Sequence, residues 1–197
     1  MNKLYPYLCA MLLLLCAGYA QADSTDYFGF RLGMGKADLE GDEVTSEPID
    51  VKSAGVVLST LPLSGAGNQL ELYLVEKGAS GTGTDAQELN LVYAELCGFS
   101  SLRTGIGANS SAYIFGGGAV SALVSAKVGD EDVSDELRSY DFSLVFGVGL
   151  DFATSKNARL AFDLRYTGGT LNISKASDDI EATNSNVMFS VTLLFNS

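Results

Sequence analysis

Charged side chains recur at alternate positions inside apolar segments, where they could be brought together in a confined space. They are Arg31, Glu71, Asp141, Asp151, Asp163 and Arg165. Two neighbouring carboxylates can act as a general acid and a general base, whereas carboxylates next to arginines form ion pairs that fill a narrow interior. The sequence favours the ion-paired interior, because the chain has no histidine, the usual proton carrier at neutral pH. We therefore predict no catalytic residue, no cofactor-binding residue and no enzymatic activity.

A second chemical candidate is an acidic segment that offers oxygen ligands to a divalent cation. Its candidate metal ligands are Asp130, Glu131, Asp132 and Asp135. The helical calcium-loop pattern fails, because Ser134 stands where Asp or Asn is required and Asp135 stands where glycine is required. A solvated, self-repelling surface and a cation site both remain open for this segment.

The elements that carry these residues are predicted from a two-residue period, because successive side chains of a strand point to opposite faces. From Tyr140 to Phe152 the even positions are aromatic or aliphatic, and the odd positions are mostly small or polar. A bulge or bend is expected in the fifth strand at Gly116–Gly118. The eight predicted strands are residues 26–38, 52–63, 68–78, 87–98, 111–128, 139–154, 157–169 and 186–196.

The two faces of these strands predict an all-β fold, an eight-stranded antiparallel up-and-down transmembrane β-barrel. One face carries the large apolar side chains and the other carries glycine, serine and charge, which is typical of a lipid-facing wall around a polar lumen. Acidic connections follow the first, fifth and seventh strands, and shorter ones such as 64–67 and 154–156 alternate with them, although 98–110 is an exception. This rhythm predicts long outer loops, short periplasmic turns and both termini in the periplasm.

Aromatic residues near the predicted strand ends are candidates for interfacial girdles, formed by Tyr and Phe because the chain has no tryptophan. They are Tyr27, Phe28, Tyr113, Tyr140, Phe152, Tyr166 and Phe195.

The first residues read as a secretory signal peptide over 1–22, with Lys3, an apolar run from Leu8 to Ala17 and small residues at Ala20 and Ala22. Residues 23–197 would then form one barrel domain, whose lone Cys97 has no partner for a disulfide. Without Lys3 this part has 24 acids and 11 bases, a charge that argues against nucleic acid as a partner.

Several segments in order resemble the PorT-like family of outer-membrane β-barrel proteins, which is related in architecture to the small OmpX and OmpA barrels. The segments are Leu70–Tyr73 with Glu76–Gly78, Tyr113–Gly118, Phe146–Leu150, Asp163–Tyr166 with Leu171–Ile173, and Asn186–Phe195. The resemblance implies the fold and a place in the bacterial outer membrane, and it implies little about activity. Such barrels often end on an aromatic residue that the assembly machinery recognises, whereas here Asn196 and Ser197 follow Phe195.

The sequence thus predicts a non-enzymatic outer-membrane barrel with a structural or surface-interaction role through its acidic outer loops. The expected partners are outer-membrane lipid and lipopolysaccharide, the barrel-assembly machinery, and divalent cations at the acidic loops. A narrow pore for small solutes is the alternative, and a secreted soluble β-sandwich is a third possibility.

Overall fold

The computed structural model describes residues 24–41, 45–82, 87–175 and 182–196, and the signal-peptide prediction lies outside them. Two short strands, β2 (Ser46–Glu47) and β7 (Glu131–Asp132), and a 3-10 turn, η1 (Ser134–Glu136), lie in the connections. The eight long strands of the described residues are β1 (Thr25–Glu40), β3 (Ile49–Leu61), β4 (Gly65–Gly81), β5 (Glu88–Gly105), β6 (Ser110–Val128), β8 (Tyr140–Ala153), β9 (Ala158–Gly169) and β10 (Thr183–Asn196).

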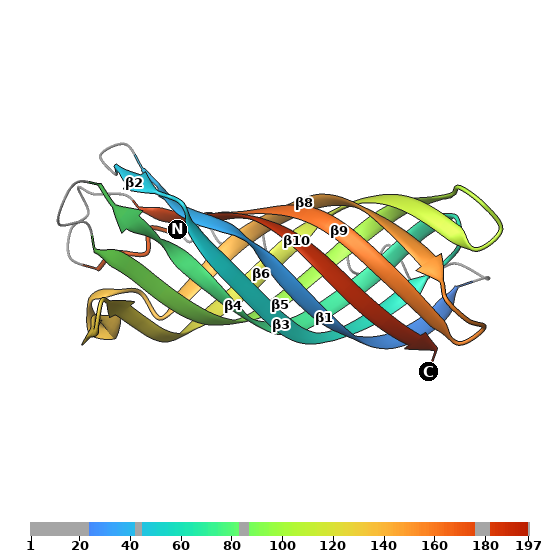
Figure 1. The fold of residues 1–197 in the computed structure, drawn as a ribbon, viewed down its shortest axis with the longest axis horizontal. Coiled ribbons are helices and arrows are strands. Elements are labelled where there is room, and N and C mark those ends of the chain that lie inside the picture. The colour runs from blue at the N-terminus through green and yellow to red at the C-terminus, as the bar shows by residue number, and fades with distance from the viewer. Residues whose placement is uncertain (1–23, 42–44, 83–86, 176–181, 197) are drawn as a thin grey trace, which may run out of the picture.

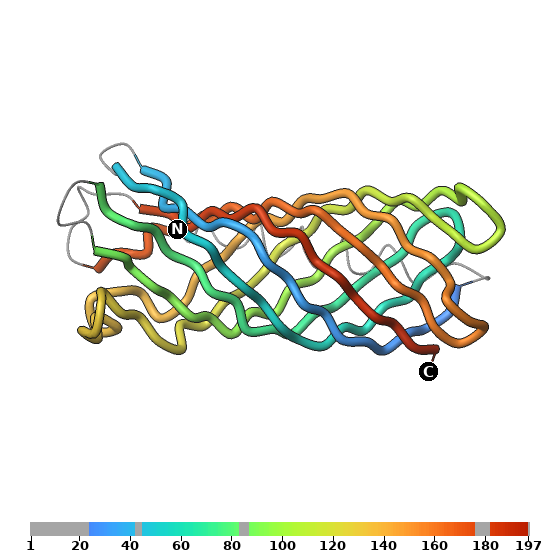
Figure 2. Tube along the Cα trace, in the orientation of Figure 1, coloured from blue at the N-terminus to red at the C-terminus, as the bar shows by residue number. Residues whose placement is uncertain are grey.

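These eight strands form a closed antiparallel barrel (Figure 1). Each long strand pairs with the next one along the chain, and β1 pairs with β10 from Tyr27↔Asn196 to Glu40↔Thr183. Figure 2 shows the first and last strands side by side along the barrel wall. The predicted up-and-down eight-stranded barrel is confirmed, and the two-sheet sandwich is wrong.

The two-residue period separates an apolar outer wall from a filled interior. In β8 the side chains of Leu144 and Phe146 are 42% and 55% exposed, whereas Val145 between them is 0% exposed. Among the described residues 27 large apolar side chains are exposed, far more than a water-soluble surface of this size normally presents.

The strand ends differ from the predicted ones mainly in β5, which continues to Gly105 instead of ending at residue 98. The connection to β6 is therefore only residues 106–109, so the exception in the predicted alternation of loop lengths disappears. The register irregularity lies between Val92 and Tyr93 of β5, opposite Val124 of β6. Gly116–Gly118 pair regularly with both neighbouring strands, so the predicted bulge at this run is wrong.

The connections differ in length between the two ends of the barrel (Figure 1). At the end that we call the turn end, residues 62–64, 106–109 and 154–157 join the strands, β1 begins and β10 ends. At the opposite end, the loop end, the longer connections 41–48, 82–87, 129–139 and 170–182 join them. No helix in the described part of the chain is long and apolar enough to cross a membrane.

Candidate functional site

The centre of the lumen holds a cluster of buried ion pairs around Glu71. Arg165 donates from both terminal nitrogens to the Glu71 carboxylate, at 2.7 and 3.1 Å, and from Nε to Asp163 at 2.8 Å. The Nε of Arg31 lies 3.8 Å from Glu71, and its guanidinium donates to Ser190 at 2.6 Å. Every charged member is at most 4% exposed, so the charges are held by one another and not by water.

A second cluster lies nearer the loop end, where Lys77 bridges two carboxylates. Its ammonium is 3.0 Å from Glu95 and 3.7 Å from Asp141. Glu95 also accepts hydrogen bonds from the hydroxyls of Tyr73 and Ser121. Asn184 donates to Asp141 at 3.0 Å.

A third cluster closes the interior near the turn end. Arg103 and Arg159 both pair with the carboxylate of Asp151. The Nε of Arg103 also donates to the carbonyl oxygen of Pro62 at 3.0 Å. This cluster ties β5, β8 and β9 to the turn that joins β3 to β4.

The structure therefore distributes the six charged residues named in the sequence analysis over three clusters. Arg31, Glu71, Asp163 and Arg165 lie together, whereas Asp141 pairs with Lys77 and Asp151 with Arg103 and Arg159. All six side chains are buried.

Sequence reasoning gave Lys77 little weight and missed Glu95, Arg103 and Arg159. The alternation carried a signal for Lys77 and Arg159, which share the parity of Glu71 and Arg165 in their strands. The alternation gives no signal for Arg103, because the predicted strand ends at residue 98.

Aromatic rings line the lumen beside its cations. The guanidinium carbon of Arg31 lies 4.8 Å from the centre of the Tyr73 ring, and that of Arg165 lies 5.6 and 5.4 Å from Phe99 and Phe115. The attraction between a cation and the face of a ring adds to the ion pairs. Lys77 lies over Tyr93 and Arg103 over Tyr113 in the same way.

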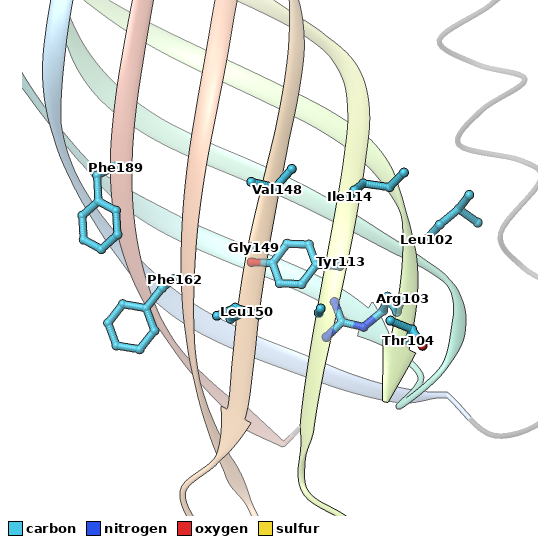
Figure 3. A pocket seen from close by; sticks show the side chains of 11 residues that line it. Leu102, Arg103, Thr104, Tyr113, Ile114, Val148, Gly149, Leu150, Phe162 and Phe189 are labelled. Carbon is cyan, nitrogen blue, oxygen red and sulfur yellow. The ribbon is translucent and has the colours of Figure 1, made fainter. Parts of the chain in front are cut away.

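Four of these rings lie against glycines of a neighbouring strand, which leave the space that the rings occupy. A Cβ added to Gly147 would collide with the Phe115 ring, and one added to Gly149 would collide with Tyr113. Figure 3 shows Tyr113 beside Gly149, with Phe162 and Phe189 projecting from the outer wall. Register places each ring directly opposite its glycine, in the pairs Gly55↔Tyr73, Gly117↔Phe99, Gly147↔Phe115 and Gly149↔Tyr113.

Apolar side chains pack together near both ends of the lumen. At the loop end Ile173, which is 2% exposed, packs into the same cluster as the inward Leu91, and Val133 and Leu137 pack against that cluster. At the turn end the residues that pack together are Tyr27, Val57, Leu61 and Leu194.

The acidic residues proposed as metal ligands lie in the connection between β6 and β8 and are exposed. Hydrogen bonds from Ser134 to Asp132 lower the pKa of the Asp132 carboxyl. In the described part of the chain no group of three or more His, Cys, Asp or Glu residues could hold a metal ion. Several of the remaining acidic loop residues lie outside the described residues, namely Asp42, Glu43, Asp178, Asp179 and Glu181.

Two members of the predicted aromatic girdle are instead inside the barrel. Tyr113 is 9% exposed over Arg103, and Tyr27 packs against the turn-end apolar cluster. Both occupy positions whose side chains face inward in the alternation of their strands. Closeness to a strand end does not indicate which face a side chain takes. The girdle residues that face outward are Phe28, Tyr140, Phe152, Tyr166 and Phe195.

The closed barrel is similar to those of small outer-membrane proteins. No family model and no curated protein matches the chain. Among solved structures, the outer membrane protein OprG from Pseudomonas aeruginosa superposes with a TM-score of 0.56 at 11% identity, covering 89% of this chain and 97% of that one. Neisserial surface protein A, NspA, gives a TM-score of 0.53 at 11% identity, with 85% and 95% covered.

These likenesses define the class by its fold: an eight-stranded barrel of the small outer-membrane type. At 11% identity these likenesses establish the fold and say nothing about a ligand or an activity. The resemblance to the PorT-like family stays a prediction.

Proposed function

We propose that this protein is a non-enzymatic integral protein of the bacterial outer membrane, with the loop end outside the cell and the turn end in the periplasm. The observation that carries the proposal is the inverted distribution of side chains. The wall is apolar on its outer face, and the ion pairs are enclosed within it. Such a wall is suited to the lipid bilayer, where apolar side chains face the hydrocarbon. A closed barrel also leaves no backbone edge unpaired in hydrocarbon.

The role that the structure supports best is a structural or surface-interacting one through the acidic loop end. The lumen offers little room for transport, since side chains such as Arg31, Tyr93 and Leu91 are fully buried in it and apolar residues pack together near both ends. Loop-end residues such as Glu47, Glu88 and Glu131 are exposed and available to partners. The proposed partners remain outer-membrane lipid, lipopolysaccharide and divalent cations that bridge acidic loops to anionic lipid, with the barrel-assembly machinery acting during insertion.

Orientation is tested by thiol labelling of intact cells in a Cys97→Ser background. We expect Glu131→Cys, in the loop-end strand β7, to react with a membrane-impermeant maleimide. Its matched control, Lys156→Cys in a turn-end connection, should react only after the outer membrane is permeabilised. If only Lys156→Cys reacted in intact cells, the barrel would have the opposite orientation, with the turn end outside the cell.

Conductance in a planar bilayer tests the closed lumen against the alternative of a narrow pore. We expect no discrete conductance steps from the purified barrel. Steady ion-conducting steps that disappear when the same preparation is unfolded would favour the pore and contradict the closed lumen.

A further inference from the structure

Three buried oxygen atoms on the inner face of the wall, near the loop end, form no hydrogen bond with any described residue. They are Oδ1 of Asp141, Oγ of Ser143 and Oδ1 of Asn184. The residues that carry them are at most 4% exposed. Buried polar atoms normally have a partner, and those without one indicate a place for an ordered water or an ion.

Strand register brings these residues together at Gly169, the last residue of β9. Ser143 of β8 pairs with Gly169, and Asn184 of β10 lies on the other side of it. A Cβ added to Gly169 would lie 2.9 Å from the carbonyl oxygen of Asn184 and 3.3 Å from Oδ2 of Asp141. Asn184 donates to the same Oδ2 at 3.0 Å. The next residue, Thr170, is exposed, so the three oxygen atoms lie just below the surface of the loop end.

The charge around these oxygen atoms is one unit negative. The Lys77 ammonium lies 3.0 Å from Glu95 and 3.7 Å from Oδ2 of Asp141, so two carboxylates share one cation. The central cluster instead sets two arginines against two carboxylates, and the turn-end cluster sets two arginines against one. A buried charge without a counter-charge is costly. A water molecule would serve the hydrogen-bonding groups and leave that charge in place, whereas a cation would serve both.

We propose that one monovalent alkali cation binds at this place, held by Oδ1 of Asp141, Oδ1 of Asn184 and Oγ of Ser143. Hard cations prefer oxygen ligands of this kind. One positive charge balances the cluster, whereas a divalent ion would leave it one unit positive. The cation joins β8 to β10 across the end of β9. The inference goes beyond the proposed surface role, and it holds for either orientation of the barrel.

Urea unfolding of the barrel in zwitterionic lipid vesicles tests the site, with Na⁺ as the probe. EDTA removes divalent ions, and N-methyl-D-glucamine replaces Na⁺ so that the ionic strength stays constant. We expect the midpoint urea concentration to rise as Na⁺ increases, because an ion that binds only the folded state stabilises it. Equal midpoints in the two salts would overturn the proposal, since a water molecule or a protonated Asp141 would then fill its place.

Variants of the ligands assign the effect to this site. Asp141→Asn should abolish the response to Na⁺, because the cluster is then neutral without the ion. Ser143→Ala, which removes one ligand oxygen, should raise the Na⁺ concentration needed for half of the stabilisation by about tenfold. The matched control is Thr192→Val, which removes another buried hydroxyl that has no hydrogen-bond partner among the described residues, and it should respond like the native barrel. A response that persists in Asp141→Asn, or that Thr192→Val weakens as much as Ser143→Ala does, would overturn the proposal.

Mg²⁺ tests the charge of the ion. In the absence of EDTA and at the same ionic strength, we expect any stabilisation by Mg²⁺ to be the same in the native barrel and in Asp141→Asn, because Mg²⁺ would act at exposed acidic residues. Stabilisation by Mg²⁺ that Asp141→Asn abolishes would overturn the assignment to a monovalent cation.

Discussion

Arg165 occupies the point of the lumen where two carboxylates would otherwise face each other. It joins Glu71 of β4 to Asp163 of its own strand and lies beside the stacked rings of Phe99 and Phe115. Its removal would leave two buried carboxylates with only Arg31 and neutral donors nearby. An uncompensated buried charge costs far more than the ion pair contributes relative to an apolar substitute.

We therefore predict that Arg165→Ala lowers the free energy of unfolding by about 2–4 kcal/mol. The measurement is urea unfolding of the barrel in lipid vesicles. Arg138→Ala is the control, since Arg138 is exposed in a loop-end connection and its loss should cost less than about 1 kcal/mol. Equally small effects at both positions would contradict the buried cluster.

The ring and glycine pairs give a second prediction at the scale of single residues. Gly147→Ala should destabilise the barrel by about 1–3 kcal/mol, because the added methyl group collides with the Phe115 ring. Phe115→Leu should recover part of this loss in the double variant. Gly107→Ala, where a Cβ meets nothing within 4 Å, should change stability by no more than about 0.5 kcal/mol in the same unfolding assay. Additive effects of Gly147→Ala and Phe115→Leu would show that the two sites do not interact.

At the scale of the element, β8 tests the two faces of the wall within one strand. Leu144→Arg should lower the free energy of unfolding by roughly 2–4 kcal/mol, because it places a charge on the face that contacts the hydrocarbon. Val145→Arg meets a packed interior instead, so its cost should not depend on the thickness of the bilayer. Vesicles of short and long acyl chains separate the two cases, and equal dependence on thickness at both positions would contradict the assignment.

Single cysteines at positions 144 to 147 in a Cys97→Ser background give an independent test of β8. We expect quenching by a lipid-soluble reagent at 144 and 146, whose native side chains are exposed, and protection at 145 and 147. A uniform response along the four positions would exclude the strand geometry. Cys97 is buried, so its replacement removes the background thiol from the interior and not from the outer wall.

The elements were largely predictable because the two-residue period is a local property of each strand. All eight long strands were anticipated, and the largest error was the end of β5. That error arose because the outward Gly98 and Ser100 lack the large apolar side chains that make the alternation visible. The partners of the ion pairs were not predictable, because the tilt and register of strands far apart in the chain decide that Arg165 meets Glu71, 94 residues away.

At the scale of the whole molecule, closure of the barrel predicts unusual resistance to detergent. Unheated protein should migrate faster than boiled protein on a dodecyl sulfate gel, since no strand edge is left for unfolding to begin. Truncation of β10 should abolish this difference in gel migration, because β1 then loses its pairing partner. Identical migration of unheated and boiled protein that circular dichroism shows to be folded would count against the closed barrel.

The pairing of β1 with β10 is the one seam that joins opposite ends of the chain, since every other long-strand pair in the described residues links consecutive strands. Until β10 pairs with β1, the sheet has two open edges that can recruit other chains. Neighbouring hairpins need only short loops to close, whereas this seam brings together residues as distant as Tyr27 and Asn196 and so meets the largest entropic barrier. The pairing of β1 with β10 thus removes both open edges at once, and with them the hazard of aggregation through those edges.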